Sequence, residues 1–205
     1  PGGMGRDILC ALSRCPSMNE QAFDLASALS DYLGRHPAEA ASCALFSGFL
    51  ATEGALFERS HPPGHFTGSA WLVSADGERV LLTHHRKLGR WLQLGGHADG
   101  DTDLAQVALR EAEEESGLVD LAVDAAIFDI DRHAIPARGD EPEHWHYDVR
   151  FVVRSTGSEA FAVSEESLAL AWKPVAQIAT DPTSDDSLQR MARKWKMYQV
   201  HFHSR

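Results

Sequence analysis

The stretch that decides the fold runs from Gly96 to Leu118 and reads GHADGDTDLAQVALREAEEESGL. Its pattern predicts a helix from Asp103 to Ser116, rich in small alanines that let a helix lie close to a sheet. On such a helix Glu111, Glu114 and Glu115 are three and four positions apart, so they share one face. The sequence therefore predicts a compact group of carboxylates on the helix.

Acidic side chains are concentrated in this region. Positions 99–115 hold seven acids and one base, a net charge of −6 out of the chain's −11. Carboxylates held together raise one another's pKa unless a cation neutralises them. Oxygen ligands of high charge suit Mg²⁺ or Mn²⁺ rather than zinc. A merely solvent-exposed acidic helix face fits the composition equally well.

The order of the residues separates these alternatives. Gly96, five residues, Thr102, seven residues and then Arg110 to Leu118 closely resemble the Nudix box. That pattern is Gly, five residues, Glu, seven residues, then Arg-Glu-U-x-Glu-Glu-x-Gly-U, where U is aliphatic. Every defined position matches except Thr102, which stands where the family has its first Glu. Asp101 and Asp103 are the candidates to replace that missing carboxylate.

The resemblance extends over about two-thirds of the chain, roughly residues 66–198. It implies an α/β protein, the Nudix-type α/β/α sandwich with a mixed sheet, that hydrolyses a diphosphate linkage in a nucleotide. By the same resemblance Glu111, Glu114, Glu115 and Gly96 would bind the cofactor, Mg²⁺ or Mn²⁺. Glu114 and Glu115 would be catalytic, with Arg110 orienting the carboxylates.

The reaction implied is attack of water on phosphorus, helped by a base that removes a proton. In this family the base can lie outside the box. Four glutamates are candidates, and the sequence does not choose among them: Glu141, Glu143, Glu165 and Glu166.

A strand predicted at 144–153 alternates cleanly between polar and apolar residues. Its apolar face is expected to lie in the core. Its polar face carries His144, His146, Asp148 and Arg150, which we expect to line the cleft and contact substrate or an extra metal. An internal salt-bridge network on a solvated sheet face is an equally good interpretation. His97 and Arg86 are two further candidates for substrate binding, against the alternatives of a loop residue and a polar turn.

The chain before the strong break at 61–65 (HPPGH) reads as helical. We expect a helical N-terminal extension over residues 1–62 and the Nudix domain over 63–205. Ser17 and Glu20 have capping-box spacing before one helix, and a second is predicted at 38–50. Their apolar stripes must be buried against the Nudix domain or in a homodimer.

The other predicted elements are short strands and one last helix. The strands are expected at 70–73, 80–83, 91–94, 125–131 and 168–172, the first two as a hairpin around Asp76-Gly77, and the helix from about Asp185.

Composition excludes several classes of partner. With 30 acids against 19 Lys and Arg, the chain lacks the basic excess that nucleic acid and anionic membranes require. No apolar run is long enough to span a bilayer, and no signal peptide is recognised. Cys10, Cys15 and Cys43 have no metal-ligand spacing and are expected to be reduced thiols of a cytoplasmic protein.

The substrate stays open at this stage. A small-molecule nucleotide is expected, first a nucleoside diphosphate derivative such as ADP-ribose or a nucleotide sugar, and second a nucleoside triphosphate. Two alternatives come from other classes. An isoprenoid diphosphate isomerase would want a cysteine in the sheet domain, where there is none. A non-catalytic nucleotide-binding module would be expected to have a damaged glutamate triad.

Overall fold

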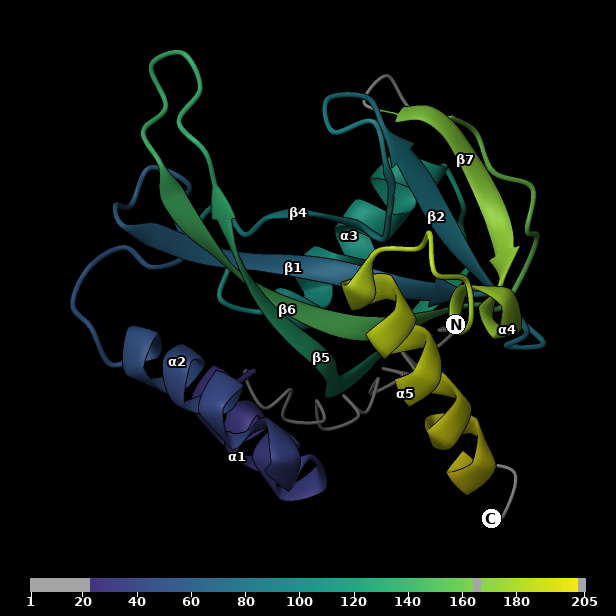
Figure 1. Ribbon diagram of the computed structural model, residues 1–205, viewed down its shortest axis with the longest axis horizontal. Helices are drawn as coiled ribbons and strands as arrows, with labels where there is room; N and C mark the ends of the chain where they lie inside the picture. Colours follow the sequence, from purple (N-terminus) through teal and green to yellow (C-terminus); the bar gives the residue numbers. More distant parts are fainter. Residues whose placement is uncertain (1–22, 164–166, 203–205) are drawn as a thin grey trace, which may run out of the picture.

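The structure, a computed structural model, describes residues 23–163 and 167–202, and of the last three of these only the backbone. Figure 1 shows a curled sheet with helices packed on it. The helices are α1 (Leu25–Arg35), α2 (Ala40–Leu50), α3 (Leu104–Ser116), α4 (Val175–Ile178) and α5 (Asp186–Phe202). The strands are β1 (Gly64–Val73), β2 (Arg79–His85), β3 (Trp91–Leu92), β4 (Leu94–His97), β5 (Leu121–Ile135), β6 (His144–Ser155) and β7 (Ser167–Pro174).

The sheet is mixed, as predicted. Its main path is β3-β2-β1-β6-β5, with β4 paired to β1 and β7 paired to β2. The strands β1 and β6 are parallel, and the other pairs are antiparallel. The predicted α/β class and the Nudix-type arrangement of a mixed sheet between helices are confirmed.

Each face of the sheet has its own hydrophobic core. On one face Phe66, Ala70 and Leu72 of β1 pack with α1, α2 and α3. On the other, Trp71 and Val73 of the same strand pack with α4 and α5. The alternation of β1 residues between the two cores follows from the period of two in a strand.

The N-terminal helices lie against the sheet. Phe49 of α2 stacks on Tyr147 of β6 with ring centroids 4.0 Å apart, and Phe46 contacts the same ring edge-on at 5.4 Å. Asp24 caps α1 by accepting from the backbone N–H of Ala26. The predicted capping pair Ser17 and Glu20 lies outside the described residues. Of the two alternatives for burying these apolar stripes, the structure shows packing against the sheet, and burial in a homodimer stays a prediction.

Three strand predictions were wrong in extent. The strand expected at 70–73 is the longer β1, which begins at Gly64. The segment expected as one strand at 91–94 is divided between β3 and β4, which pair with β2 and β1 respectively. The strand expected at 125–131 is the longer β5 of 15 residues, because β6 supplies hydrogen-bonding partners along its length. Pairing with a distant strand extends β5 beyond the positions that local pattern marks as apolar.

Candidate active site

The Nudix-box helix α3 lies unusually close to the sheet because glycines stand opposite it. A Cβ on Gly68 of β1 would come within 2.8 Å of the carbonyl oxygen of Leu104. A Cβ on Gly96 of β4 would come within 2.6 Å of Cδ of Glu111. The carboxylate of Glu111 therefore rests on the backbone of β4, where no other residue type would leave it room.

Two glutamates of the predicted triad lie at this contact. Glu115 Oε1 accepts a 2.8 Å hydrogen bond from the backbone N–H of Gly95. The side chain of Glu111 is 18% exposed, and Glu114, one turn further along, is exposed. Asp103 caps the start of α3, and Gly117 ends it in the left-handed conformation with φ 66°. Both ends of the helix are thus set by local sequence, which places the three glutamates together.

Arg110 holds the β4 end of the site in place. Its Nη2 donates to the carbonyl oxygen of His97 at 3.2 Å and lies 3.6 Å from Glu111 Oε1. Asp101 Oδ2 is 3.6 Å from Arg110 Nη1, whereas Thr102 is exposed. Asp103 instead accepts from the N–H groups of Ala105 and Gln106. Asp101 is therefore the carboxylate that contacts Arg110 where the Nudix pattern departs.

The donor set fits a hard divalent cation. Glu111 lies against Gly96 of β4 and Glu115 accepts from the backbone of Gly95, so two carboxylates of the helix meet the glycines of this strand. Mg²⁺ and Mn²⁺ prefer such oxygen-only sets.

Of the four candidate bases, Glu141 lies nearest a described site residue, with Oε1 3.7 Å from Nε2 of His144. Arg59 forms a 2.5 Å ion pair with Asp99, and this hydrogen bond raises the pKa of Arg59, with the charges of Glu111 and Glu141 adding to the effect. Glu141 and Glu143 are both exposed in the loop between β5 and β6. Glu165 and Glu166 lie outside the described residues.

Five histidines gather on the sheet face opposite α3. His97, His144 and His146, all singled out from the sequence, are joined by His65 of β1 and His133 of β5, which sequence reasoning missed. Neighbouring ring centroids are 4.7–5.4 Å apart. The missing signal was strand register: His65 pairs with His146, and His146 with His133, a row that no local spacing reveals.

These imidazoles are held neutral. Burial, followed by the neighbouring imidazoles His97 and His144, lowers the pKa of His65 to about 4. Burial together with the adjacent histidines lowers the pKa of His146 to about 2. His65 and His146 are therefore uncharged nitrogen donors at neutral pH.

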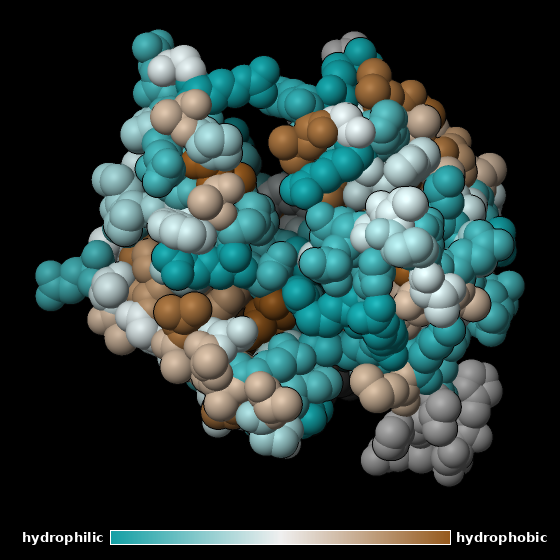
Figure 2. All heavy atoms as spheres, in the orientation of Figure 1, coloured by the Kyte–Doolittle hydropathy of each residue, from teal (hydrophilic) through white to brown (hydrophobic). Residues whose placement is uncertain are grey.

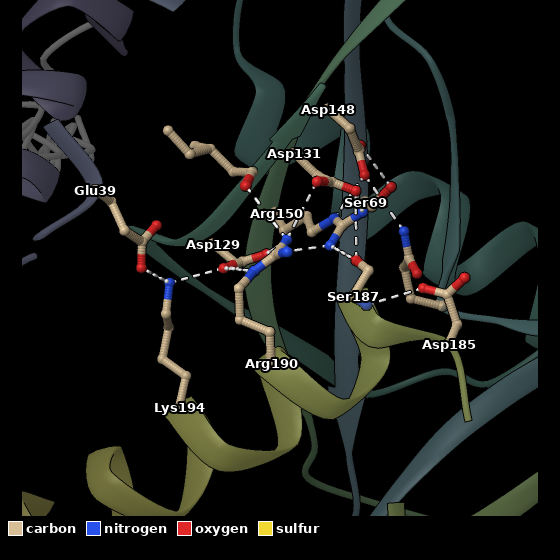
Figure 3. A network of polar contacts seen from close by, with 12 residues as sticks. Glu39, Ser69, Asp129, Asp131, Asp148, Arg150, Asp185, Ser187, Arg190 and Lys194 are labelled. Atoms are coloured by element: carbon tan, nitrogen blue, oxygen red, sulfur yellow. Dashed lines mark hydrogen bonds and ion pairs between the residues drawn. The ribbon is translucent and has the colours of Figure 1, made fainter. Parts of the chain in front are cut away.

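Asp148 and Arg150 continue the same polar face but are enclosed (Figure 3). Arg150 is buried, and its guanidinium contacts Asp148 at 2.7 Å, Asp131 at 2.9 Å and Asp129 at 3.1 Å. Asp148 also accepts from Thr67 and Ser69 of β1. Every contact described for this pair is internal, which favours the salt-bridge interpretation. The network is buried, however, and not solvated as that interpretation supposed.

The helix α5 and the N-terminal helices complete this network. Arg190 of α5 contacts Asp129 at 2.8 Å, and Lys194 contacts Asp129 at 2.7 Å and Glu39 at 2.8 Å (Figure 3). Burial raises the pKa of Asp129, but Arg150, Arg190 and Lys194 outweigh it and leave that pKa below its ordinary value. We call this group of Asp129, Asp131, Asp148, Arg150, Arg190 and Lys194 the buried ion network.

A cavity of about 570 Å³ opens beside the network, between β2–β3 and the start of α5. Arg90, Trp91, Lys173 and Asp185 line it, with Lys173 Nζ 4.5 Å from the centre of the Trp91 ring. Arg86, predicted to bind substrate, is exposed and donates to the carbonyl oxygen of Ser167 at 3.1 Å.

Comparison with known proteins identifies the family. The sequence profile of the NUDIX domain matches residues 65–194. The chain therefore belongs to the NUDIX family, hydrolases that act on phosphorus-containing substrates. Enzymes of this family generally need a divalent metal ion. A comparison with curated proteins gives no match.

Solved structures are similar to this chain to different degrees. A Caenorhabditis elegans Ap4A hydrolase in a binary complex has a TM-score of 0.53 at 16% identity, covering 66% of this chain and 98% of that one. A NUDIX-family hydrolase from Clostridium perfringens has 21% identity and a TM-score of 0.46, covering 65% and 97%. The NUDIX domain of Shewanella oneidensis NrtR, complexed with ADP ribose, has 20% identity and a TM-score of 0.47, covering 75% and 97%.

Proposed function

We propose that the chain is a metal-dependent hydrolase that cleaves the diphosphate linkage of a nucleoside diphosphate derivative, such as ADP-ribose or a nucleotide sugar. The observation that carries the proposal is the joint placement of Glu111 and Glu115 on the β4 glycines, with Glu114 on the same helix face. An acidic face serving only solubility would need neither the close glycines nor the hydrogen bond from Gly95.

In this proposal Glu111, Glu114, Glu115 and the backbone of Gly96 hold Mg²⁺ or Mn²⁺. A divalent ion there would supply neutralisation of charge on the diphosphate oxygens and a more acidic water nucleophile. Arg110 donates to the carbonyl oxygen of His97 and so holds the end of strand β4 against α3. The box glutamates thereby keep their positions relative to the backbone of β4.

Glu141 is the base that we propose for the proton of the attacking water. The charge of its carboxylate raises the pKa of Arg59 and acts in the same direction on the pKa of His97, the last residue of β4. Arg59 itself is paired with Asp99 at 2.5 Å.

The cavity between β2–β3 and α5, which the box glutamates do not line, is our candidate for holding the rest of the nucleotide. Trp91 gives it an aromatic surface, and Arg90 and Lys173 give it cations that suit a nucleotide's phosphate or a polar base. We place ADP-ribose-like compounds first. A nucleoside triphosphate, cleaved to a monophosphate and pyrophosphate, is the second candidate because the same donors would accept it.

The experiment is a panel of nucleotides incubated with the full chain and Mg²⁺ or Mn²⁺ in ¹⁸O-water, with products identified by mass. Cleavage of a nucleoside diphosphate derivative with ¹⁸O in one phosphate supports the proposal. Release of pyrophosphate from a triphosphate would favour the second candidate. Tight binding of one nucleotide with no turnover of any would contradict the enzyme and favour a binding module.

Two further proposals concern the setting of the enzyme. Leu33 and Leu45 are exposed on α1 and α2, and Figure 2 shows apolar atoms gathered over these helices, a surface suited to a homodimer. Light scattering of the full chain and of the Leu33→Ser, Leu45→Ser variant tests this.

We also propose a cytoplasmic protein with reduced thiols. Cys43 is a buried free thiol, and Cys10 and Cys15 lie outside the described residues. Within residues 23–163 and 167–202, no helix has the length and apolar character to cross a bilayer.

A further inference from the structure

The histidine cluster lies on the other side of β4 from the box glutamates. Gly96 faces α3, whereas the next residue, His97, sends its ring to the opposite face and contacts His65 with ring centroids 5.1 Å apart. Strand register brings the other members together, since His65 pairs with His146 on adjacent strands. The cluster is therefore a second centre, separate from the glutamates.

Its nitrogen atoms converge. One ring nitrogen each from His65, His144 and His146 lies within 4.8 Å of the other two. The closest pair, Nε2 of His144 and Nε2 of His146, is 3.2 Å apart. Two imidazole ligands of one tetrahedral zinc ion, each about 2.0–2.1 Å from the metal, are about 3.3 Å from each other. The observed separation matches such a pair.

The protonation of His144 directs a lone pair into the cluster. Its Nδ1 lies 2.9 Å from the carbonyl oxygen of Pro142, and because a carbonyl can only accept, Nδ1 carries the proton. In the neutral ring Nε2 then carries the lone pair, on the side of His146. A ligating histidine whose other nitrogen donates to a backbone carbonyl is the usual arrangement around protein-bound zinc.

His65 supplies the second observation that points to a ligand. It is fully buried, and neither of its ring nitrogens has a hydrogen-bond partner among the described residues. A proton shared between His144 and His146 would satisfy those two rings alone and would leave His65 without a partner. A cation bound by all three rings would give one nitrogen of each ring a partner, His65 included, and buried polar groups are ordinarily paired.

We propose that His65, His144 and His146 form a binding site for a transition-metal ion of the zinc class, separate from the Mg²⁺ or Mn²⁺ site of the box. Neutral imidazoles favour Zn²⁺, Co²⁺, Ni²⁺ or Cu²⁺ over Mg²⁺.

The test uses Co²⁺ as a spectroscopic probe in the full chain, freed of metal by a chelator and kept in excess Mg²⁺. We expect one Co²⁺ per chain with the visible absorption of nitrogen-ligated cobalt, displaced by Zn²⁺. His144→Gln and His146→Gln should each weaken binding by at least about 100-fold, the upper end of the loss found even for outer-shell partners.

Two control variants should keep the cobalt spectrum. His84→Gln removes an imidazole on β2 outside the cluster, and Glu114→Gln changes the box. Absence of the absorption band, or a band lost in Glu114→Gln but kept in both histidine variants, would overturn the proposal.

A second measurement covers the case in which the histidine variants do not fold. X-ray absorption of the zinc-loaded unaltered chain should show three imidazole ligands, and Zn²⁺ should raise its melting temperature. A first shell made of oxygen alone would contradict the site.

Discussion

Two groups of three carboxylates lie in this molecule, and the protein treats them in opposite ways. Asp129, Asp131 and Asp148 of the buried ion network contact Arg150, Arg190 and Lys194 at distances of 2.7–3.3 Å. Glu111, Glu114 and Glu115 of the box lie partly exposed against backbone, with Arg110 3.6 Å from Glu111.

The difference separates structure from function. A buried carboxylate without a counter-ion is costly, so the aspartates had to be matched by cations of the chain itself. The glutamates are partly or fully exposed, so an ion from solution can reach them. If this contrast is right, a variant of a box glutamate should change activity alone. A variant in the buried ion network should first lower the stability of the fold.

The largest expected effect is in the box. Glu114→Gln or Glu115→Gln should lower Mg²⁺-dependent turnover by about 1,000-fold, because loss of metal stabilisation costs several kcal/mol in the transition state. The melting temperature should change little, since Glu114 is exposed. Glu113→Gln, an exposed neighbour on α3, is the matched control and should keep its activity. Turnover close to that of the unaltered chain in Glu114→Gln and Glu115→Gln would remove the box glutamates from the mechanism.

The complementary variant is Arg150→Met in the buried ion network. It leaves three aspartates without their shared guanidinium and should lower the free energy of unfolding by about 3–5 kcal/mol in urea titrations. Lys196→Met on the exposed side of α5 is the control, expected to stay within about 0.5 kcal/mol. A folded Arg150→Met variant with unchanged stability but lost activity would reverse the comparison and make Arg150 a substrate ligand.

The network should also make stability depend on pH. Because its cations hold the pKa of Asp129 below the ordinary value of 3.8, this carboxylate contributes stability that is present above that value. That contribution is lost as the pH falls through the lower folded-state pKa. Unfolding free energies measured from about pH 5 downwards should therefore fall, and Asp129→Asn should flatten the slope. An equal slope in the variant would assign the acid sensitivity to other groups.

Sequence reasoning succeeded where the determinants are local. The helix from Asp103 to Gly117 has its cap, its glutamate spacing and its stop signal in one short segment, and the structure has all three. It failed where partners are distant along the chain. His65 and His146 meet through parallel register, and Asp129 meets Lys194 across 65 positions, so no spacing rule exposes either contact.

The polar face of β6 shows the same limit within one strand. Alternation put His144, His146, Asp148 and Arg150 on one side, as the structure does, but could not divide them. The difference comes from the residues that pack on each part of the strand. Near Arg150, α5 places Arg190 against Asp129, whereas the histidines contact other histidines. Tertiary packing decides which residues of one face are paired internally.

The smallest effect is expected at the departure from the box pattern. Thr102 is exposed, and Arg110 already contacts Asp101 and the carbonyl of His97. Thr102→Glu should therefore change kcat/KM by less than about threefold, whereas Asp101→Asn should lower it by about tenfold because Arg110 loses a carboxylate partner. The Asp101→Asn, Thr102→Glu double variant decides the point. If the added Thr102→Glu substitution restores the activity lost at position 101, the two carboxylates serve one role, and the ordering of Arg110 matters more than the position that supplies it. If Thr102→Glu alone raises kcat/KM about tenfold or more, Asp101 does not replace the missing Glu, and the native box is only partly ordered.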